Sequence, residues 1–204
     1  KNFASFKHEM AISLEIARDE IHVDPHDYTE IIKQPQYLVD KMYQETIASL
    51  QLVHQSINIH SIDQICHMIY NAKKVHMIGY QFNKIISNDF QMKMLKLKKF
   101  VYAFVERGDE IQRLDMIDED SLVIIITVRA RKQFMAPLLE KIHEHNPQIL
   151  LITMNKEFQN DLIDFTYCID GTESDYTESS MQGTINFLSL LNLIYVRYGL
   201  LYRK

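Results

Sequence analysis

Three basic side chains are concentrated in one short stretch of the sequence. Arg129, Arg131 and Lys132 lie within four consecutive positions, directly after an apolar run and directly before a helical pattern. Arginine can bind a phosphate or carboxylate through two parallel hydrogen bonds, and lysine adds a compact positive charge. Cations at the start of a helix oppose the helix dipole, and a bound anion offsets that repulsion. We therefore predict that residues 127–132, the cationic loop, bind an anion; the alternatives are a solvated surface and a subunit contact.

A second segment of similar design lies upstream. It contains Gly79, Tyr80, Gln81 and Asn83, and it also follows an apolar run and enters a helical pattern. Both segments would place backbone N–H groups at a helix N-terminus, where an anion is stabilised. We expect the polar residues of this segment, together with Thr127, to contact the body of a ligand whose anionic group lies on the cationic loop.

The other polar residues form no metal or catalytic motif. The nine histidines are scattered, and Cys66 and Cys168 lack metal-ligand spacing, so we predict no metal site, no cofactor and no catalytic residue. An acidic group made of Glu173, Asp175 and Glu178 precedes the last helical pattern. Such residues more often cap helices than act as general acids or bases. Glu173 is included among the candidate ligand-binding residues.

Short apolar runs alternate with helical patterns after residue 73. The clearest run, Leu122 to Ile126, is apolar without alternation, as in a parallel strand covered by helices on both faces. Strands that alternate with helices form right-handed β-α-β units. The sequence therefore predicts an α/β fold, a doubly wound parallel sheet flanked by helices, with ligands bound beyond the carboxyl ends of the strands. The predicted strands are 75–78, 100–105, 121–127, 149–153 and 167–169, and the predicted helices are 85–95, 134–143 and 178–202.

The first 73 residues contain helical patterns only. They predict a helix over 3–16, a longer one that follows Pro35, and a third over 62–71. Ser61 is the expected N-cap of the third helix, with Asp63 in the first turn, where the helix dipole favours an acidic side chain. We therefore divide the chain into a helical part, 1–73, and an α/β part, 74–204.

Charge and composition narrow the function. The net charge of −5 argues against a main nucleic-acid-binding role for this piece, because such proteins carry a basic surface. No apolar run reaches the roughly 20 residues of a membrane-spanning helix. The first residues lack the pattern of a signal peptide, so we expect a cytoplasmic protein that does not contact a membrane. The chain does not begin with methionine, and we interpret it as a fragment of a longer protein.

Several segments, taken in order, resemble one known family. Residues 75–83 and 89–94 look like the first strand, glycine loop and helix of SIS (sugar isomerase) domains. Residues 119–127 look like the second signature of these domains, and residues 149–153 look like their next strand. Residues 179–193 look like the closing helix of RpiR-type bacterial transcription regulators, and residues 2–7 resemble the end of their helix-turn-helix domain. The order and spacing of these segments are more specific than any one of them.

The resemblance implies a sensor domain rather than an enzyme. Residues 1–73 would be the end of a helix-turn-helix domain and a helical linker, and residues 74–204 the SIS domain. A phosphorylated sugar bound there would change the spacing or order of two DNA-binding heads, which lie upstream and are absent from this chain. A homodimer or homotetramer that regulates sugar metabolism is implied.

The two loops depart from the family pattern. The first, of the form Gly-x-Gly-x-Ser, has Gln81 and Asn83 at its second glycine and its serine. The second, of the form Ser-x-Ser-Gly-x-Thr, keeps a hydroxyl at Thr127 and is otherwise cationic. A different anion or a larger phosphorylated molecule is therefore an alternative ligand. The alternative functions are a sugar-phosphate isomerase, with Glu173 as the nearest candidate base, and an oligomerisation module with a vestigial pocket.

Overall fold

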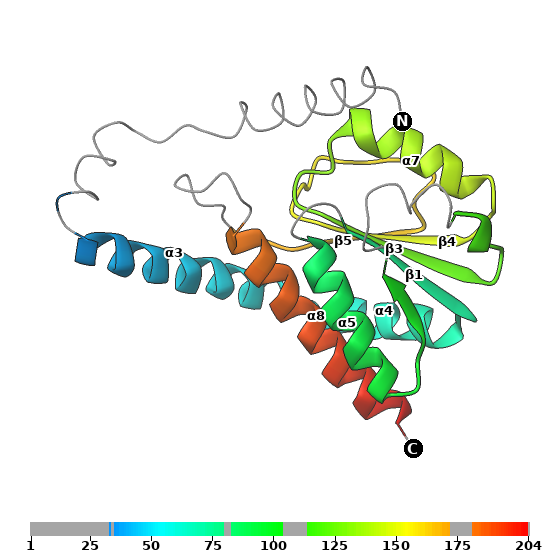
Figure 1. The fold of residues 1–204 in the computed structure, drawn as a ribbon, viewed down its shortest axis with the longest axis horizontal. Helices are drawn as coiled ribbons and strands as arrows, with labels where there is room; N and C mark the ends of the chain where they lie inside the picture. The colour runs from blue at the N-terminus through cyan, green and yellow to red at the C-terminus, as the bar shows by residue number, and fades with distance from the viewer. Residues whose placement is uncertain (1–32, 34, 80–82, 104–113, 172–180, 204) are drawn as a thin grey trace, which may run out of the picture.

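Five parallel strands form one sheet at the centre of the structure (Figure 1). The computed structural model describes residues 33, 35–79, 83–103, 114–171 and 181–203. The strand order is β2-β1-β3-β4-β5, and every neighbouring pair is parallel, which confirms the predicted doubly wound α/β fold. The strands are β1 (Lys74–Gly79), β2 (Val101–Ala103), β3 (Ser121–Thr127), β4 (Gln148–Thr153) and β5 (Phe165–Cys168).

The direction in which strands are added reverses between β1 and β3. From β1 the chain moves outward to the edge strand β2, and it then returns to the other side of β1 to form β3, β4 and β5 in succession. In an open parallel sheet such a reversal leaves a crevice beyond the carboxyl ends of the two central strands. The two loops singled out from the sequence follow β1 and β3, so they leave the sheet at this point.

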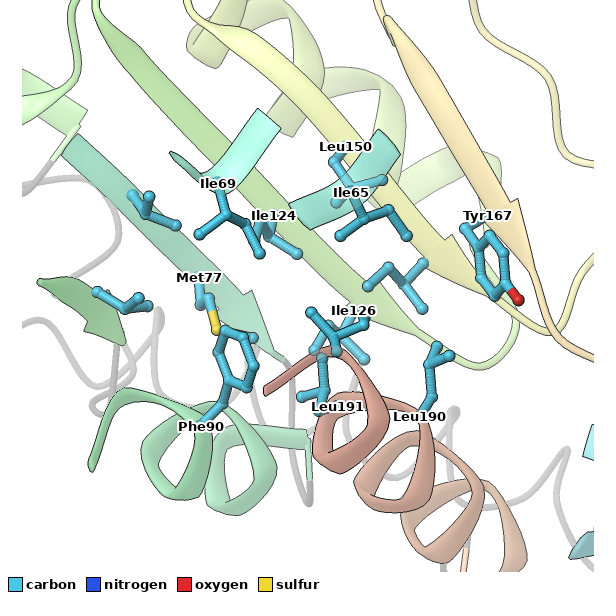
Figure 2. Close-up of a cluster of buried hydrophobic side chains, with 14 of the residues drawn as sticks. Ile65, Ile69, Met77, Phe90, Ile124, Ile126, Leu150, Tyr167, Leu190 and Leu191 are labelled. Carbon is cyan, nitrogen blue, oxygen red and sulfur yellow. The ribbon is translucent and has the colours of Figure 1, made fainter. Parts of the chain in front are cut away.

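In the described part of the chain, helices cover both faces of the sheet (Figure 1). Figure 2 shows the larger core, in which Phe90 lies beside Met77 and Leu191 lies beside Ile126. Each large apolar side chain buried in this way contributes about 1.5–3 kcal/mol. The face with the larger core is covered by α4 (Ile59–Asn71), α5 (Asn83–Lys96) and α8 (Met181–Tyr202), and α3 (Pro35–Ser56) packs against α8. The opposite face is covered by α7 (Lys132–His143) and the 3-10 turn η1 (Leu114–Met116).

Burial explains why β3 could be predicted. All its residues are buried except the last, Thr127, because helices cover both of its faces. The edge strand β2 begins one residue later than predicted: it begins at Val101, and Phe100 before it is 63% exposed. Residues 104 and 105 of that predicted strand, and the predicted helix over 3–16, lie outside the described residues.

The start of α4 differs from the prediction. Asn58, not Ser61, is the N-cap: its backbone is extended, and its side-chain oxygen accepts hydrogen bonds from the N–H groups of His60 and Ser61. Asp63 consequently lies beyond the first turn, where it pairs with Arg197 of α8 through two hydrogen bonds of 2.6 and 2.9 Å. Asparagine and serine cap helices about equally well, so residue type alone did not decide between them.

The division at residue 73 remains a prediction. Helix α4 precedes that position, yet it contributes Ile62, Ile65, Cys66 and Ile69 to the larger core shared with the sheet. The last helical segment of the N-terminal part is therefore packed as an integral layer of the α/β domain.

Helix α8 is more apolar than the sequence analysis assumed. By length and composition alone, its stretch 182–202 is able to cross a membrane, contrary to our expectation that no segment would. In this structure one side of the helix lies in the domain core, where Phe187, Leu190 and Ile194 are fully buried. Burial against the sheet accounts for this side of the helix, but only 33% of the apolar window is buried, and Val196 and Leu200 are 54% and 74% exposed.

Acid is expected to destabilise the fold through His76. This histidine lies in β1, is 1% exposed and stacks on Tyr102 of β2, with ring centroids 5.5 Å apart. Burial, with a smaller contribution from the charge of Lys74, lowers the pKa of His76 from 6.5 to about 4. The unfolded chain then binds the extra proton first, so stability present above pH 6.5 is lost as the pH falls towards 4. We expect a loss of about 3 kcal/mol across this window, measured by urea unfolding.

A His76→Phe variant is the matched control for that measurement. It keeps an aromatic ring against Tyr102 but has no group that titrates, so its unfolding free energy should change much less across the same window. A second acid-sensitive contact acts at lower pH: hydrogen bonds from Lys74 and Ser121 lower the pKa of Asp118 to about 2. Equal pH dependence in wild type and variant would contradict the assignment to His76.

Candidate functional site

The candidate site lies at the carboxyl ends of β1 and β3. These strands are neighbours, with Gly79 paired in register to Ile126, so Thr127 extends one residue beyond the end of β1. The segment after Gly79 enters α5 at Asn83, and the segment after Thr127 enters α7 at Lys132. Two helix N-termini therefore belong to connections that start from the same edge of the sheet, as the sequence predicted.

The start of α5 is packed directly onto the end of β1. A Cβ atom at Gly79 would lie 2.6 Å from the carbonyl oxygen of Asn83 and 2.7 Å from Oγ of Ser87. Only glycine fits this approach, because one of the two contacts is to backbone. The Ser87 hydroxyl donates a 3.0 Å hydrogen bond to the Asn83 carbonyl and holds the first turn. Tyr80 and Gln81 lie between β1 and α5 in the sequence and were predicted to contact the ligand. Both residues lie outside the described residues.

Asn83 has a buried oxygen for which the described residues provide no hydrogen-bond donor. The residue is 7% exposed, and among the described residues its Oδ1 atom has no hydrogen-bond partner. A buried acceptor without a donor costs about 1–3 kcal/mol, so such groups usually mark the position of a ligand, a water molecule or a functional strain. Asn83 can therefore accept a hydrogen bond from a hydroxyl group of a ligand.

The cationic loop turns through a left-handed residue. Ala130 has φ of 44°, a conformation that favours glycine, and is 1% exposed. The Thr127 hydroxyl accepts a 3.3 Å hydrogen bond from the Ala130 N–H and closes the turn. Around this buried turn Arg129 is exposed, Arg131 is half-buried and Lys132 is exposed. The three predicted cations are thus grouped in one loop beyond β3.

The N-terminus of α7 lacks a side-chain cap. Arg131 occupies the N-cap position with extended backbone, its side chain makes no capping hydrogen bond, and the first turn contains no acidic residue. The helix therefore begins with its positive dipole end among three cationic side chains. Such an arrangement is unfavourable by a few tenths of a kcal/mol per charge unless an anion is present, and it provides both N–H donors and guanidinium groups for one.

Strand β4 holds the cationic loop through main-chain carbonyls, a feature that the sequence analysis missed. The carbonyl of Val128 accepts hydrogen bonds of 3.2 Å from both the Thr153 hydroxyl and the Met154 N–H. Asn155 Nδ2 donates a 2.7 Å bond to the carbonyl of Arg129. The only signal in the sequence was the position of Thr153 and Asn155 at the end of a predicted strand.

Replacing Ala130 by glycine tests the left-handed turn. Glycine relieves the strain of positive φ by about 1 kcal/mol and loses one buried methyl group, so we expect unfolding stability to be unchanged or slightly higher. Ala136→Gly, within α7, is the control and should lower stability by about 1 kcal/mol. Urea unfolding of both variants measures the difference. Equal losses would show that Ala130 is not strained.

Glu173 lies outside the described residues, so its place in the site stays a prediction. Within the described residues, no group of three or more histidine, cysteine or acidic side chains is arranged to hold a metal ion. The described parts of the two loops contain no carboxylate or imidazole, and they offer cationic side chains, a hydroxyl and an amide.

Comparison with known proteins shows a match to one protein family and similarity in sequence to a transcriptional regulator. A profile of the SIS domain family matches residues 68–194. The chain is 19% identical over 152 residues to an uncharacterized HTH-type transcriptional regulator of Clostridium perfringens, and this stretch covers 72% of the chain and 54% of the regulator. The chain thus spans about half the length of this curated relative.

Solved structures with the same fold include regulators and enzymes. The sugar isomerase domain of an RpiR transcription factor from Sphaerobacter thermophilus has a TM-score of 0.69 at 15% identity, over 80% of this chain and 90% of that chain. The Vibrio vulnificus NanR protein complexed with ManNAc-6P has a TM-score of 0.69 at 13% identity, over 84% and 66%. A phosphoheptose isomerase from Francisella tularensis has a TM-score of 0.64 at 12% identity, over 82% and 99%.

Proposed function

This chain belongs to the SIS domain family, and from that premise we propose that it is the effector-sensing domain of a bacterial RpiR-type transcription regulator. Its effector is a phosphorylated sugar or a closely related anion. The chain binds this effector without transforming it. DNA is bound in the cytoplasm by a helix-turn-helix domain upstream, and the regulator acts as a homodimer or homotetramer. The named regulators with related sequence or the same fold support this proposal.

The observation that carries the proposal is the uncapped start of α7 among three cations. Arg129, Arg131 and Lys132 face the phosphate, and the first N–H groups of α7 add donors to it. Thr127 and Asn83 contact the sugar body, the latter through its unsatisfied oxygen. Gly79 allows the close approach of α5, and Tyr80, Gln81 and Glu173 complete the predicted contacts.

The backbone of the cationic loop explains how a family site can persist with altered side chains. Ala130 stands where the resemblance places the glycine of the Ser-x-Ser-Gly-x-Thr loop, and its φ of 44° is a glycine conformation. The path of the loop is therefore compatible with the family pattern, while the hydroxyl groups have been replaced by guanidinium and ammonium groups. We propose that these side chains hold the phosphate in place of the missing hydroxyls.

Thermal unfolding with a panel of anions tests the proposal. The panel contains ManNAc-6P, glucose 6-phosphate and inorganic phosphate, with unphosphorylated ManNAc as the matched control. A ligand at a hundred times its dissociation constant stabilises by about 2.7 kcal/mol, which raises Tm by about 5–10 °C for a domain of this size. We expect a saturable increase with a sugar phosphate and none with ManNAc. No increase with any phosphorylated sugar would contradict an effector of this class, and aldose–ketose interconversion by the chain would contradict a purely sensory role.

A further inference from the structure

Helix α3 carries two hydroxyl groups on the side that contacts the rest of the domain. Ser49 and Ser56 are seven residues apart, about two helical turns, so they share one face. The Ser49 hydroxyl accepts a 2.8 Å hydrogen bond from Nδ2 of Asn186 on α8, and both residues are fully buried. The Ser56 hydroxyl accepts a 3.2 Å bond from the N–H of Asp170, two residues beyond β5. Figure 1 shows α3 alongside the first part of α8.

The first hydroxyl is connected to the cationic loop by close packing. The N–H of Met154 donates to the Val128 carbonyl in that loop. The Met154 side chain lies against Gly171, where a Cβ atom would be 2.9 Å from its Cε atom, 2.4 Å from Nδ2 of Asn186 and 3.2 Å from Oγ of Ser49. Three segments therefore meet at Gly171 without room for one methyl group.

The second hydroxyl is connected by polar contacts alone. Asn155 Nδ2 donates to the Arg129 carbonyl of the cationic loop. The next residue, Lys156, forms an ion pair with Asp170, whose N–H donates to Ser56. The two connections start from adjacent carbonyls in one loop and end on one face of one helix.

The contact at Asn186 is incompletely satisfied. Its Nδ2 atom donates to Ser49, but its buried Oδ1 atom has no hydrogen-bond partner among the described residues. A buried amide in this state contributes less stability than a well-packed apolar side chain. Among the described residues, the bond to Ser49 is therefore the one side-chain hydrogen bond of Asn186 that a second arrangement of α3 would give up.

We infer that α3 is the output element of the sensor: an anion on the cationic loop alters the docking of α3 through Asn155 and Met154. This inference rests on the proposed function. Contacts between the anion and the side chains of the loop shift the carbonyls of Val128 and Arg129, and these carbonyls hold both connections.

Hydrogen exchange of α3 tests the connection without any ligand. Asn155→Ala removes the bond to the Arg129 carbonyl and one turn bond to Glu157. Asn160→Ala is the matched control, because Asn160 makes a similar turn bond to Leu162 and no described contact with the cationic loop. We expect amide exchange in residues 45–56 to accelerate about fivefold in Asn155→Ala, the factor for one hydrogen bond, and to be unchanged in Asn160→Ala. Equal exchange in both variants would overturn the inference.

The same measurement with ManNAc-6P tests the regulation. We expect the ligand to change the exchange of residues 45–56 at least about twofold in wild type and in Thr46→Ala, and by a clearly smaller factor in Ser56→Ala, in which only the connection through Met154 remains. Both hydroxyls donate to a carbonyl of their own helix, but in the described contacts only that of Ser56 also accepts from Asp170. A Tm increase without a change in α3 would overturn the inference and leave the proposed function intact. No Tm increase would count against the proposed function, and the ligand-free variants would still decide whether loop and helix are connected.

Discussion

Charge reversal at Arg131 is expected to weaken binding of a phosphorylated sugar about a hundredfold while the domain stays folded. A charge-assisted hydrogen bond contributes about 1.5–3 kcal/mol, and the new carboxylate adds repulsion to the loss of that bond. Arg131 is half-buried in the loop, so it is the cation with the least freedom to turn away from the anion. Isothermal titration of Arg131→Glu with the panel ligand that stabilises the wild type measures the loss.

Lys141→Glu provides the control for this reversal. Lys141 is exposed in the last turn of the same helix, so the substitution makes an identical change of net charge far along α7 from the cationic loop. We expect its affinity to stay within about threefold of wild type, because exposed charges at this separation are largely screened. Equal loss in both variants would indicate a general electrostatic effect, and unchanged affinity in Arg131→Glu would remove Arg131 from the site.

The second large effect is expected from a single methyl group. Gly79→Ala should lower the free energy of unfolding by about 2–3 kcal/mol and abolish ligand binding. The added Cβ atom would lie 2.6 Å from the Asn83 carbonyl oxygen and 2.7 Å from its carbon, so the first turn of α5 has to move. Urea unfolding measures the stability, and the thermal assay with the sugar phosphate measures the binding.

Gly199→Ala is the matched substitution at an unconstrained glycine. Gly199 lies inside α8, and an added Cβ atom would meet only the Leu97 side chain, at 3.5 and 3.6 Å. Alanine in a helix interior is more favourable than glycine by about 0.5–1 kcal/mol, so this variant should gain stability. A loss at Gly79 no greater than the change at Gly199 would show that the end of β1 tolerates a wider approach of α5.

The central strands could be predicted because strands buried on both faces consist of consecutive apolar residues. In β3 the whole run from Ser121 to Ile126 is buried, so an unbroken apolar pattern was sufficient. At the edge the same reasoning placed the start of β2 one residue too early, because phenylalanine is a residue type typical of strands although Phe100 is exposed. The cap of α4 was misplaced for a related reason: Asn58 and Ser61 are both good caps, and only backbone conformation distinguishes them.

The sequence predicted the three cations of the candidate site but not the residues that support the loop. Three cations between a strand and a helix can be found by spacing, and the structure groups them in one loop. The left-handed conformation of Ala130 could not be predicted, because alanine rarely adopts it without neighbours that enforce it. Thr153 and Asn155 were missed because their role depends on β4 lying next to β3, which is a property of the sheet order.

The way in which β4 supports the loop has a consequence for the evolution of ligand preference. The hydrogen bonds that Thr153, Met154 and Asn155 donate to the cationic loop end on the carbonyl oxygens of residues 128 and 129, which every amino acid possesses. Mutations at these two positions can therefore change what the loop presents to a ligand without removing its anchors. A duplicated gene could in this way acquire a new effector through a few side-chain replacements, with the scaffold inherited unchanged.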